Sequence, residues 1–281
     1  MESVIDTTDY LSFVLSIPGI PPISVLSLFF LALMRIAPVV ATAPFLGAKL
    51  PSGVKIGLAI SIAAVMLPHL LIASKTQLVT FNVQFAGYCL KEIFVGMCIA
   101  ILVNIPFYVV QSSGILIDFL RGSSALQIQD PLMQTQSSSI GQLYNYIFIV
   151  IFYQIGGVFA FLEGFLNSYT FIPANSLIPA TFFYLHLPFW QFILGLLTKF
   201  LALSIQLAAP SIVAILMAEM FLGIANRLAP QVQIAFLGMS LKSLTGLALL
   251  WAGWFFILQQ LGKQSLIWLD SLNLLIRSFP H

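Results

Sequence analysis

Long apolar runs separated by short polar stretches make up most of this chain. Six runs approach the roughly 20 residues that a helix needs to cross a bilayer. Residues 1–23 precede them, and their acidic start lacks the basic region of a secretory signal, so we expect an internal run to direct insertion. Residues 262–281 predict an amphipathic tail. The pattern predicts an all-α integral membrane protein with one domain over residues 1–281. The runs cover residues 24–46, 56–74, 86–117, 143–166, 189–220 and 232–258, and the tail's apolar stripe is Leu266, Leu269, Leu272 and Ile276.

Composition supports the membrane assignment and excludes several function classes. The 281 residues are 60% hydrophobic and 7% charged, whereas soluble domains carry roughly 25% charge. The net charge of +2 is too small to indicate nucleic acid. Cys89 and Cys98 form no CxxC motif, and we interpret both as packing residues. Without a metal, phosphate or dinucleotide motif, the sequence predicts no catalytic site and no cofactor.

Charges and prolines interrupt the apolar runs. Arg35, Glu219 and Lys242 lie inside runs, and Glu163 lies near the end of one. A charge at the bilayer centre costs at least about 2.5–3.5 kcal/mol, so each must face a protein group or water. Pro210 frees a backbone carbonyl that neighbouring protein must satisfy. The runs are therefore expected to be kinked helical hairpins rather than plain spans.

The distribution of basic residues between loops gives no orientation. A plain six-span arrangement places four on each side, so the positive-inside rule ties. We take this tie as evidence against six independent spans. One side would hold Lys49, Lys55, Arg121 and Arg227, and the other Lys75, Lys91, Lys263 and Arg277.

Two clusters around the runs have the character of protein contacts. In the first, Arg35 is followed by Pro44, Pro51 and Lys55, which predicts a fixed turn between two apolar helices. An ordinary loop is the alternative. In the second, Pro210 precedes an acid, a glycine and a base on one helical face, too far apart for a direct acid–base pair. We expect their partners on other helices or chains, and a helix end with charges among lipid headgroups is the alternative. The second cluster comprises Pro210, Glu219, Gly223, Arg227, Pro230, Gln231 and Lys242.

A third stretch, residues 111–144, resembles neither an apolar run nor a charged loop. Gly114 and Asp118 share one helical face with Gln111, and Arg121 is close enough to pair with Asp118. The helix is predicted to end near Gly122. The polar stretch that follows is almost uncharged, which favours a buried setting. A solvated connection between two membrane helices is the alternative.

Together these clusters resemble the FliR/SctT family of type III secretion export-gate proteins, in order and over residues 30 to 245. The central element resembles the injectisome branch more than the flagellar one. Ile115 departs from relatives that often have Glu after the glycine. The resemblance rests on Arg35, Pro44-Phe-Leu-Gly, Pro51 and Lys55, then Gly114-Ile-Leu-Ile-Asp118-Phe-Leu-Arg121-Gly122 and Asp130-Pro131, then Pro210, Glu219, Gly223, Arg227, Pro230-Gln231 and Lys242.

The resemblance implies a non-enzymatic, multi-pass protein of the bacterial inner membrane in a virulence-associated secretion system. Its implied partners are SctR-type and SctS-type gate subunits, an SctU-type switch protein and an SctV-type export protein. Its implied fold is a set of kinked hairpins within a helical hetero-oligomeric export gate. The favoured function is a structural and gating subunit that passes unfolded proteins. A small-solute secondary transporter or channel is the alternative.

Within such a gate, residues 122–139 are a candidate plug across the channel. A nearly uncharged lining with a few apolar side chains, such as Leu132 and Met133, holds neither charged nor apolar substrates tightly. Gly122 and Gly141 would be hinges, and Gly114 with Asp118 would anchor the base. Asp118 and Arg121 would hold the closed position. Asp130-Pro131 marks a turn within the plug.

Overall fold

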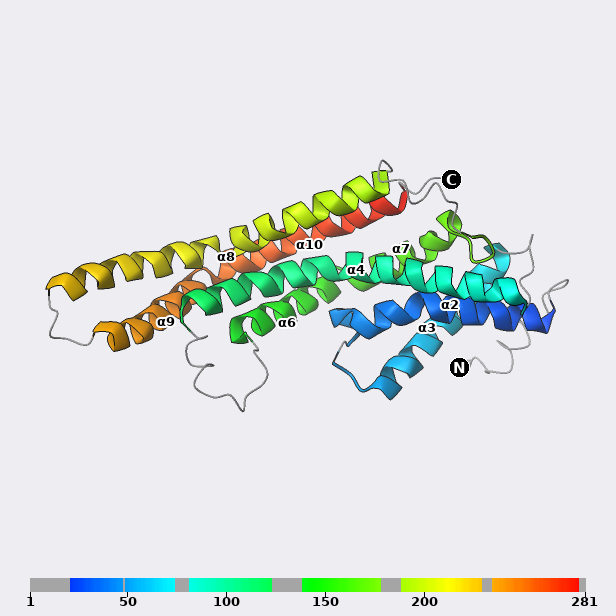
Figure 1. Ribbon diagram of the computed structural model, residues 1–281, viewed down its shortest axis with the longest axis horizontal. Coiled ribbons are helices and arrows are strands. Elements are labelled where there is room, and N and C mark those ends of the chain that lie inside the picture. Colours follow the sequence, from blue (N-terminus) through cyan, green and yellow to red (C-terminus); the bar gives the residue numbers. More distant parts are fainter. Residues whose placement is uncertain are drawn as a thin grey trace, which may run out of the picture. The chain divides into compact units, whose positions relative to one another are not determined.

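The computed structural model describes residues 21–47, 49–73, 81–122, 138–177, 188–228 and 234–277 (Figure 1). These residues are mostly helical and include no strand, which confirms the all-α prediction. Among them, four helices are long and apolar enough to cross a membrane, or up to six if each of two bent helix pairs is one span. The chain is therefore a membrane protein.

The helices group into two compact units that each use separated parts of the chain. The first unit takes residues up to Asn104, Val158–Phe192 and the C-terminal residues from Ser271, and the second takes Ile105–Gly157 and Ile193–Asp270. Helix α4 (Val83–Leu120) contributes to both units. No single cut in the sequence therefore separates them.

In the first unit, α2 (Pro22–Thr42) and α3 (Ser52–Ala73) form a hairpin. A short 3₁₀ turn, η1 (Pro44–Leu46), follows α2 and begins at a proline. The hairpin forms because α2 has an apolar stripe at helical spacing, including the fully buried Leu28, Leu31 and Ile36, while α3 supplies Leu70 and Leu71. Helix α7 (Gly157–Phe171) completes the unit together with the first part of α4.

The second unit combines the end of α4 with α6 (Ser139–Gln154), α8 (Pro188–Leu228), α9 (Ile234–Ala252) and α10 (Trp254–Arg277). Phe107 of α4 lies 5.0 Å from Phe148 and 5.4 Å from Phe152 between ring centroids, in edge-on contacts. Such aromatic pairs contribute about 0.5–1.5 kcal/mol beyond the burial of their area. They fix α6 against α4.

Two predicted runs are broken in the structure. Residues 143–166, predicted as one run, divide between α6 and α7 at Ile155 and Gly156, where Gly156 has a φ of 74°. Residues 232–258 divide between α9 and α10 at Gly253. Hydropathy cannot detect these breaks because apolar residues continue on both sides of each glycine.

The C-terminal tail is not a separate helix. Helix α10 begins at Trp254 and continues through Gly262 to Arg277, so the expected boundary at residue 262 lies within a helix. A glycine in a helix interior costs only about 1 kcal/mol relative to alanine, and α10 continues through Gly262. The amphipathic character of the tail stays a prediction from the sequence.

Candidate functional site

Helices α4 and α6 approach each other closely at two facing glycines. A Cβ added to Gly114 would lie 2.5 Å from the Cα and N atoms of Gly141, and one added to Gly141 would lie 2.9 Å from the carbonyl oxygen of Gln111. Real Cβ contacts are essentially never shorter than 3.0 Å. Both positions therefore require glycine for packing, and Gly114 lies at the base of the central stretch as predicted.

This contact gives Gly141 a packing role, and its role as a hinge stays a prediction. Gly141 lies in the first turn of α6, and its φ is not positive. The contact with Gly114 accounts for a glycine there without any bending motion. Gly122, by contrast, has a φ of 87° and follows the last turn of α4, so the predicted helix end is confirmed. A left-handed residue after a helix is typically glycine.

The carboxylate of Asp118 connects the end of α4 to the beginning of α6. Its Oδ2 accepts hydrogen bonds from the Ser138 hydroxyl and, at 2.9 Å, from the backbone N–H of Ile140. Ser138 is the N-cap of α6 and accepts the N–H of Gly141 at 2.8 Å. Asp118 is only 4% exposed. One buried carboxylate thus satisfies an N–H of the first turn of α6, where negative charge is favoured.

Arg121 completes this cluster. Its Nη2 lies 2.7 Å from Asp118 Oδ1, which confirms the predicted pair at i and i+3. The side chain is 14% exposed and its Nε atom is buried without a hydrogen-bond partner among the described residues. Its Cβ lies 3.9 Å from the position a Cβ would take at Gly246 of α9. The end of α4 is therefore held by α6 on one side and approached by α9 on another.

The remaining predicted plug residues lie outside the described residues. These are Asp130, Pro131, Leu132 and Met133, which belong to residues 123–137. The structure describes both flanks of this segment and leaves the plug itself as a prediction.

In the second unit, Glu219 of α8 pairs with Lys242 of α9. Their side chains are 41% and 25% exposed, respectively. The prediction that Glu219 finds its partner on another helix is confirmed, and that partner belongs to the same chain. Gly223 and Arg227 continue along α8 with both residues exposed, and a Cβ at Gly223 would meet no atom within 4 Å. Pro230 and Gln231 lie outside the described residues.

Arg35 is fully buried in the first unit and has a carboxylate partner. Its guanidinium donates to both oxygens of Glu92, through Nε and through Nη2, the latter at 2.9 Å. Gly96, one turn after Glu92, lets α2 come close, because a Cβ there would lie 2.3 Å from the carbonyl oxygen of Arg35. The predicted need of Arg35 for a protein partner is confirmed. Neither Glu92 nor Gly96 was among the predicted site residues.

The same cluster binds the end of α7. Arg35 donates to the Ser168 hydroxyl at 3.0 Å and to the Ile172 carbonyl at 2.7 Å, and its Cζ lies 3.7 Å from the ring centroid of Tyr169. Lys91 lies 2.6 Å from Glu92 and donates to the Pro173 carbonyl at 2.7 Å. Two cations thus share one carboxylate, and the carbonyls that follow α7 supply further negative charge. The cluster joins three helices of the first unit.

The predicted turn between the first two apolar helices is also present. Pro44 begins η1, and the carbonyl of Pro51 accepts the backbone N–H groups of Val54 and Lys55 at 3.0 and 3.2 Å. The ammonium of Lys55 donates to the carbonyl of Ala41 at 3.2 Å, which ties the start of α3 to the end of α2. Pro210 lies inside α8. Among the described residues, no group of three or more His, Cys, Asp and Glu residues is placed to hold a metal ion.

Comparison with known proteins identifies the family of this chain. Residues 26–266 match the family described as bacterial export proteins, family 1. The chain belongs to this family. The match includes α3, α4 and α6–α9 entirely, and it contains every residue of the Arg35, Asp118 and Glu219 clusters. The resemblance to the FliR/SctT family that the sequence motifs indicated is therefore confirmed.

Relatives of this chain have names that refer to translocation, surface presentation of antigens and flagellar biosynthesis. "Yop proteins translocation protein T" of Yersinia pestis is 29% identical over 66% of this chain and 70% of its own length. "Surface presentation of antigens protein SpaR" of Salmonella typhimurium is 28% identical over 78% and 79%. "Flagellar biosynthetic protein FliR" of Bacillus subtilis is 25% identical over 76% and 81%. The chain is thus similar both to translocation proteins and to flagellar biosynthetic proteins.

Proposed function

We propose that this chain is a structural and gating subunit of the export gate of a type III secretion system, through which unfolded secreted proteins pass. The observation that carries this proposal is the family match over residues 26–266. The relatives named as translocation, surface presentation and flagellar biosynthetic proteins support it. The proposed location is the bacterial inner membrane. The export role implies no catalytic step in this chain.

The proposed partners are SctR-type and SctS-type gate subunits, with an SctU-type switch protein and an SctV-type export protein around them. The last turns of α8 support a protein neighbour. They expose Met220, Phe221 and Leu228 beside the open position at Gly223 and the charge of Arg227. A mixed apolar and charged face fits another helix better than it fits lipid hydrocarbon, in which an unpaired charge is costly.

Co-purification tests this assembly. The tagged chain is expressed in its native host and purified from the membrane in mild detergent. The proteins that remain bound to it are then identified. Arg227→Glu is expected to reduce the retained gate subunits several-fold, whereas Lys199→Glu, at another exposed position of α8, is the matched control. A stable isolated chain that instead drives uptake of a small solute into vesicles would favour the secondary-transporter alternative.

Within the gate, we propose that residues 122–139 close the channel. Residues 123–137 contain one ionisable residue, Asp130, among polar and a few apolar residues. Their flanks support a fixed base, because Asp118 binds both the end of α4, through Arg121, and the start of α6. A closure element needs such a base so that the segment between the anchors can move without disturbing the helices.

Conductance measurements test the closure. Removing residues 124–136 while keeping Asp118, Arg121 and Ser138 is expected to leave assembly unchanged, because the anchoring contacts remain. The assembled gate, inserted into planar bilayers, is then expected to conduct ions at rest. Closed-level conductance in this variant, with assembly intact, would show that the segment is not the plug.

A further inference from the structure

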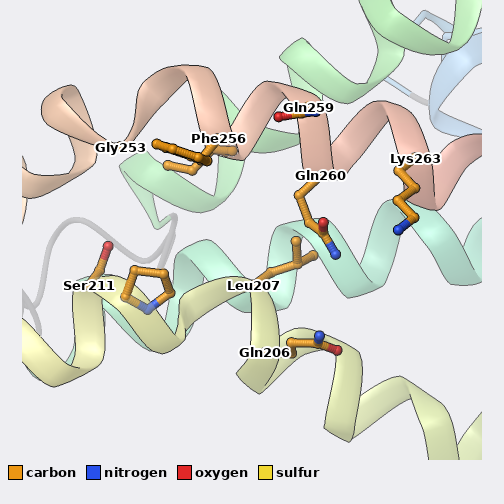
Figure 2. A pocket seen from close by; sticks show the side chains of 10 residues that line it. Gln206, Leu207, Ser211, Gly253, Phe256, Gln259, Gln260 and Lys263 are labelled. Carbon is orange, nitrogen blue, oxygen red and sulfur yellow. The ribbon is translucent and has the colours of Figure 1, made fainter.

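Helices α8 and α10 enclose a cavity of about 520 Å³ within the second unit (Figure 2). This volume lies within the range of about 300–1,000 Å³ that is usual for small-ligand sites. By area the lining is mainly apolar, although five of the ten lining residues are polar. Its polar lining includes Gln206, Ser211, Gln260 and Lys263, and its apolar lining includes Leu207 and Phe256. Such a mixed lining on helices of a membrane protein calls for an amphipathic occupant.

A proline inside α8 and the junction between α9 and α10 lie at this cavity. Pro210 lies inside α8 and removes the hydrogen bond that residue 210 would donate to the carbonyl of Gln206. On the opposite side, Gly253 separates α9 from α10. Both Pro210 and Gly253 line the cavity. The carbonyl of Gln206 thus loses its usual helical donor, whereas the Gly253 carbonyl accepts the backbone N–H of Ile257 at 3.0 Å.

The charge of the cavity is positive. Lys263 is exposed, and of the described residues that line the cavity none is acidic. Gln260 lies one turn earlier on the same helix, and Figure 2 shows both side chains extending from α10 on the side that faces α8. A single negative charge would complement this site, and an ammonium with adjacent amide groups is suited to a phosphate ester.

Lys263 is the last residue of a bent helix pair, Ser240–Ala252 and Trp254–Lys263, that together is long and apolar enough to cross a membrane. Before it, Trp251, Phe255 and Phe256 are 83%, 72% and 73% exposed, as expected for side chains that contact lipid tails. After it, α10 becomes amphipathic, with Asp270 and Asn273 among the apolar residues. Aromatic and basic side chains gather where hydrocarbon gives way to headgroups. Lys263 is therefore placed to meet a headgroup while the aromatic side chains meet its acyl chains.

We propose that this cavity binds the headgroup of an anionic phospholipid, with the Lys263 ammonium on the phosphate and the Gln260 amide beside it. Basic pockets between membrane helices bind anionic headgroups in this way. The larger apolar part of the lining, which includes Leu207 and Phe256, accommodates the start of the acyl chains. This site is independent of the proposed export role and depends only on the chain's place in a membrane.

The test titrates the purified full chain in detergent with phosphatidylglycerol or phosphatidylcholine and counts bound lipids by native mass spectrometry. The wild type is expected to bind phosphatidylglycerol more tightly. Lys263→Gln is expected to weaken that binding about fivefold, as for the loss of one lysine near an anionic surface. Gln260→Glu, which places a carboxylate beside the phosphate, is expected to weaken it at least as much. Lys199→Gln removes an exposed lysine of α8 outside the cavity and should leave binding unchanged.

Four outcomes would overturn the proposal. The first is equal affinity of the wild type for the two lipids. The second is unchanged phosphatidylglycerol binding in both Lys263→Gln and Gln260→Glu. The third is binding of inorganic phosphate with the same dependence on Lys263, since the cavity would then accept an ion without acyl chains. The fourth is photo-crosslinking from position 263 of the native complex to a protein subunit and not to lipid, which would make the cavity a protein interface.

Discussion

Gly114→Ala tests whether the contact between α4 and α6 holds the base of the central stretch. The added Cβ would lie 2.5 Å from two backbone atoms of Gly141 and 2.7 Å from the carbonyl carbon of Ile140. Backbone atoms cannot rotate away as a flexible side chain can. The helices must therefore separate by about 1 Å to reach ordinary van der Waals contact.

Three effects set the expected change in the free energy of unfolding, one stabilising and two destabilising. Alanine in a helix interior is favoured over glycine by about 1 kcal/mol. Overpacking costs about 1–3 kcal/mol. Separation of the helices also stretches the 2.9 Å hydrogen bond from the Ile140 N–H to Asp118, and a hydrogen bond to a charged group contributes about 1.5–3 kcal/mol. The free energy of unfolding should therefore fall by on the order of 2–4 kcal/mol.

The assay is unfolding of the purified chain in detergent, followed by circular dichroism. Gly57→Ala is the matched control, because Gly57 lies within α3 and a Cβ there would meet no atom within 4 Å. The control should be as stable as the wild type or more stable. If Gly114→Ala also matches the wild type, the helices do not pack at Gly114 and Gly141 as described, and the reasoning fails.

Two further predictions concern the ion pairs. Glu92→Gln leaves Arg35 buried without its carboxylate and should lower the free energy of unfolding by about 3–5 kcal/mol, seen as a loss of folded protein by size-exclusion chromatography. Glu163→Gln, at an exposed carboxylate of α7, should behave as the wild type. Equal yields of the two variants would contradict the role of the cluster. Glu219→Gln should cost less than about 1 kcal/mol because both members of its pair with Lys242 are partly exposed. A double-mutant cycle with Lys242→Met measures this coupling, and a value of several kcal/mol would show that the pair is shielded from solvent.

Hydropathy and turn chemistry predicted the helices well where a polar stretch or a helix-ending residue marks the boundary. Gly122 ends α4, and Pro44 and Pro51 mark the turn before α3. Within apolar sequence the signal is absent, so the breaks at Gly156 and Gly253 were missed. A glycine inside an apolar run is equally compatible with close packing and with a chain break, and only the tertiary structure distinguishes the two.

The buried ion cluster was missed for a related reason. Lys91 was counted as a loop charge in the orientation tally, but it lies inside α4 and is 5% exposed. Without Lys91, the basic residues in loops no longer divide equally between the two sides of the membrane. Its neighbour Glu92 is buried with it, so two adjacent charges mark a contact between helices and not a loop. The pairing with Arg35 joins residues 57 positions apart, which periodicity along one helix cannot reveal.

The Asp118 carboxylate has a consequence for the evolutionary variability of the family. It fixes α4 and α6 next to each other, so the two ends of the intervening sequence are already in place. Doubling the length of a flexible loop costs only about 0.6 kcal/mol of closure entropy. Insertions and deletions between Gly122 and Ser138 should therefore accumulate at little expense to folding. Related chains can therefore differ in the length of this segment while keeping the same helical frame.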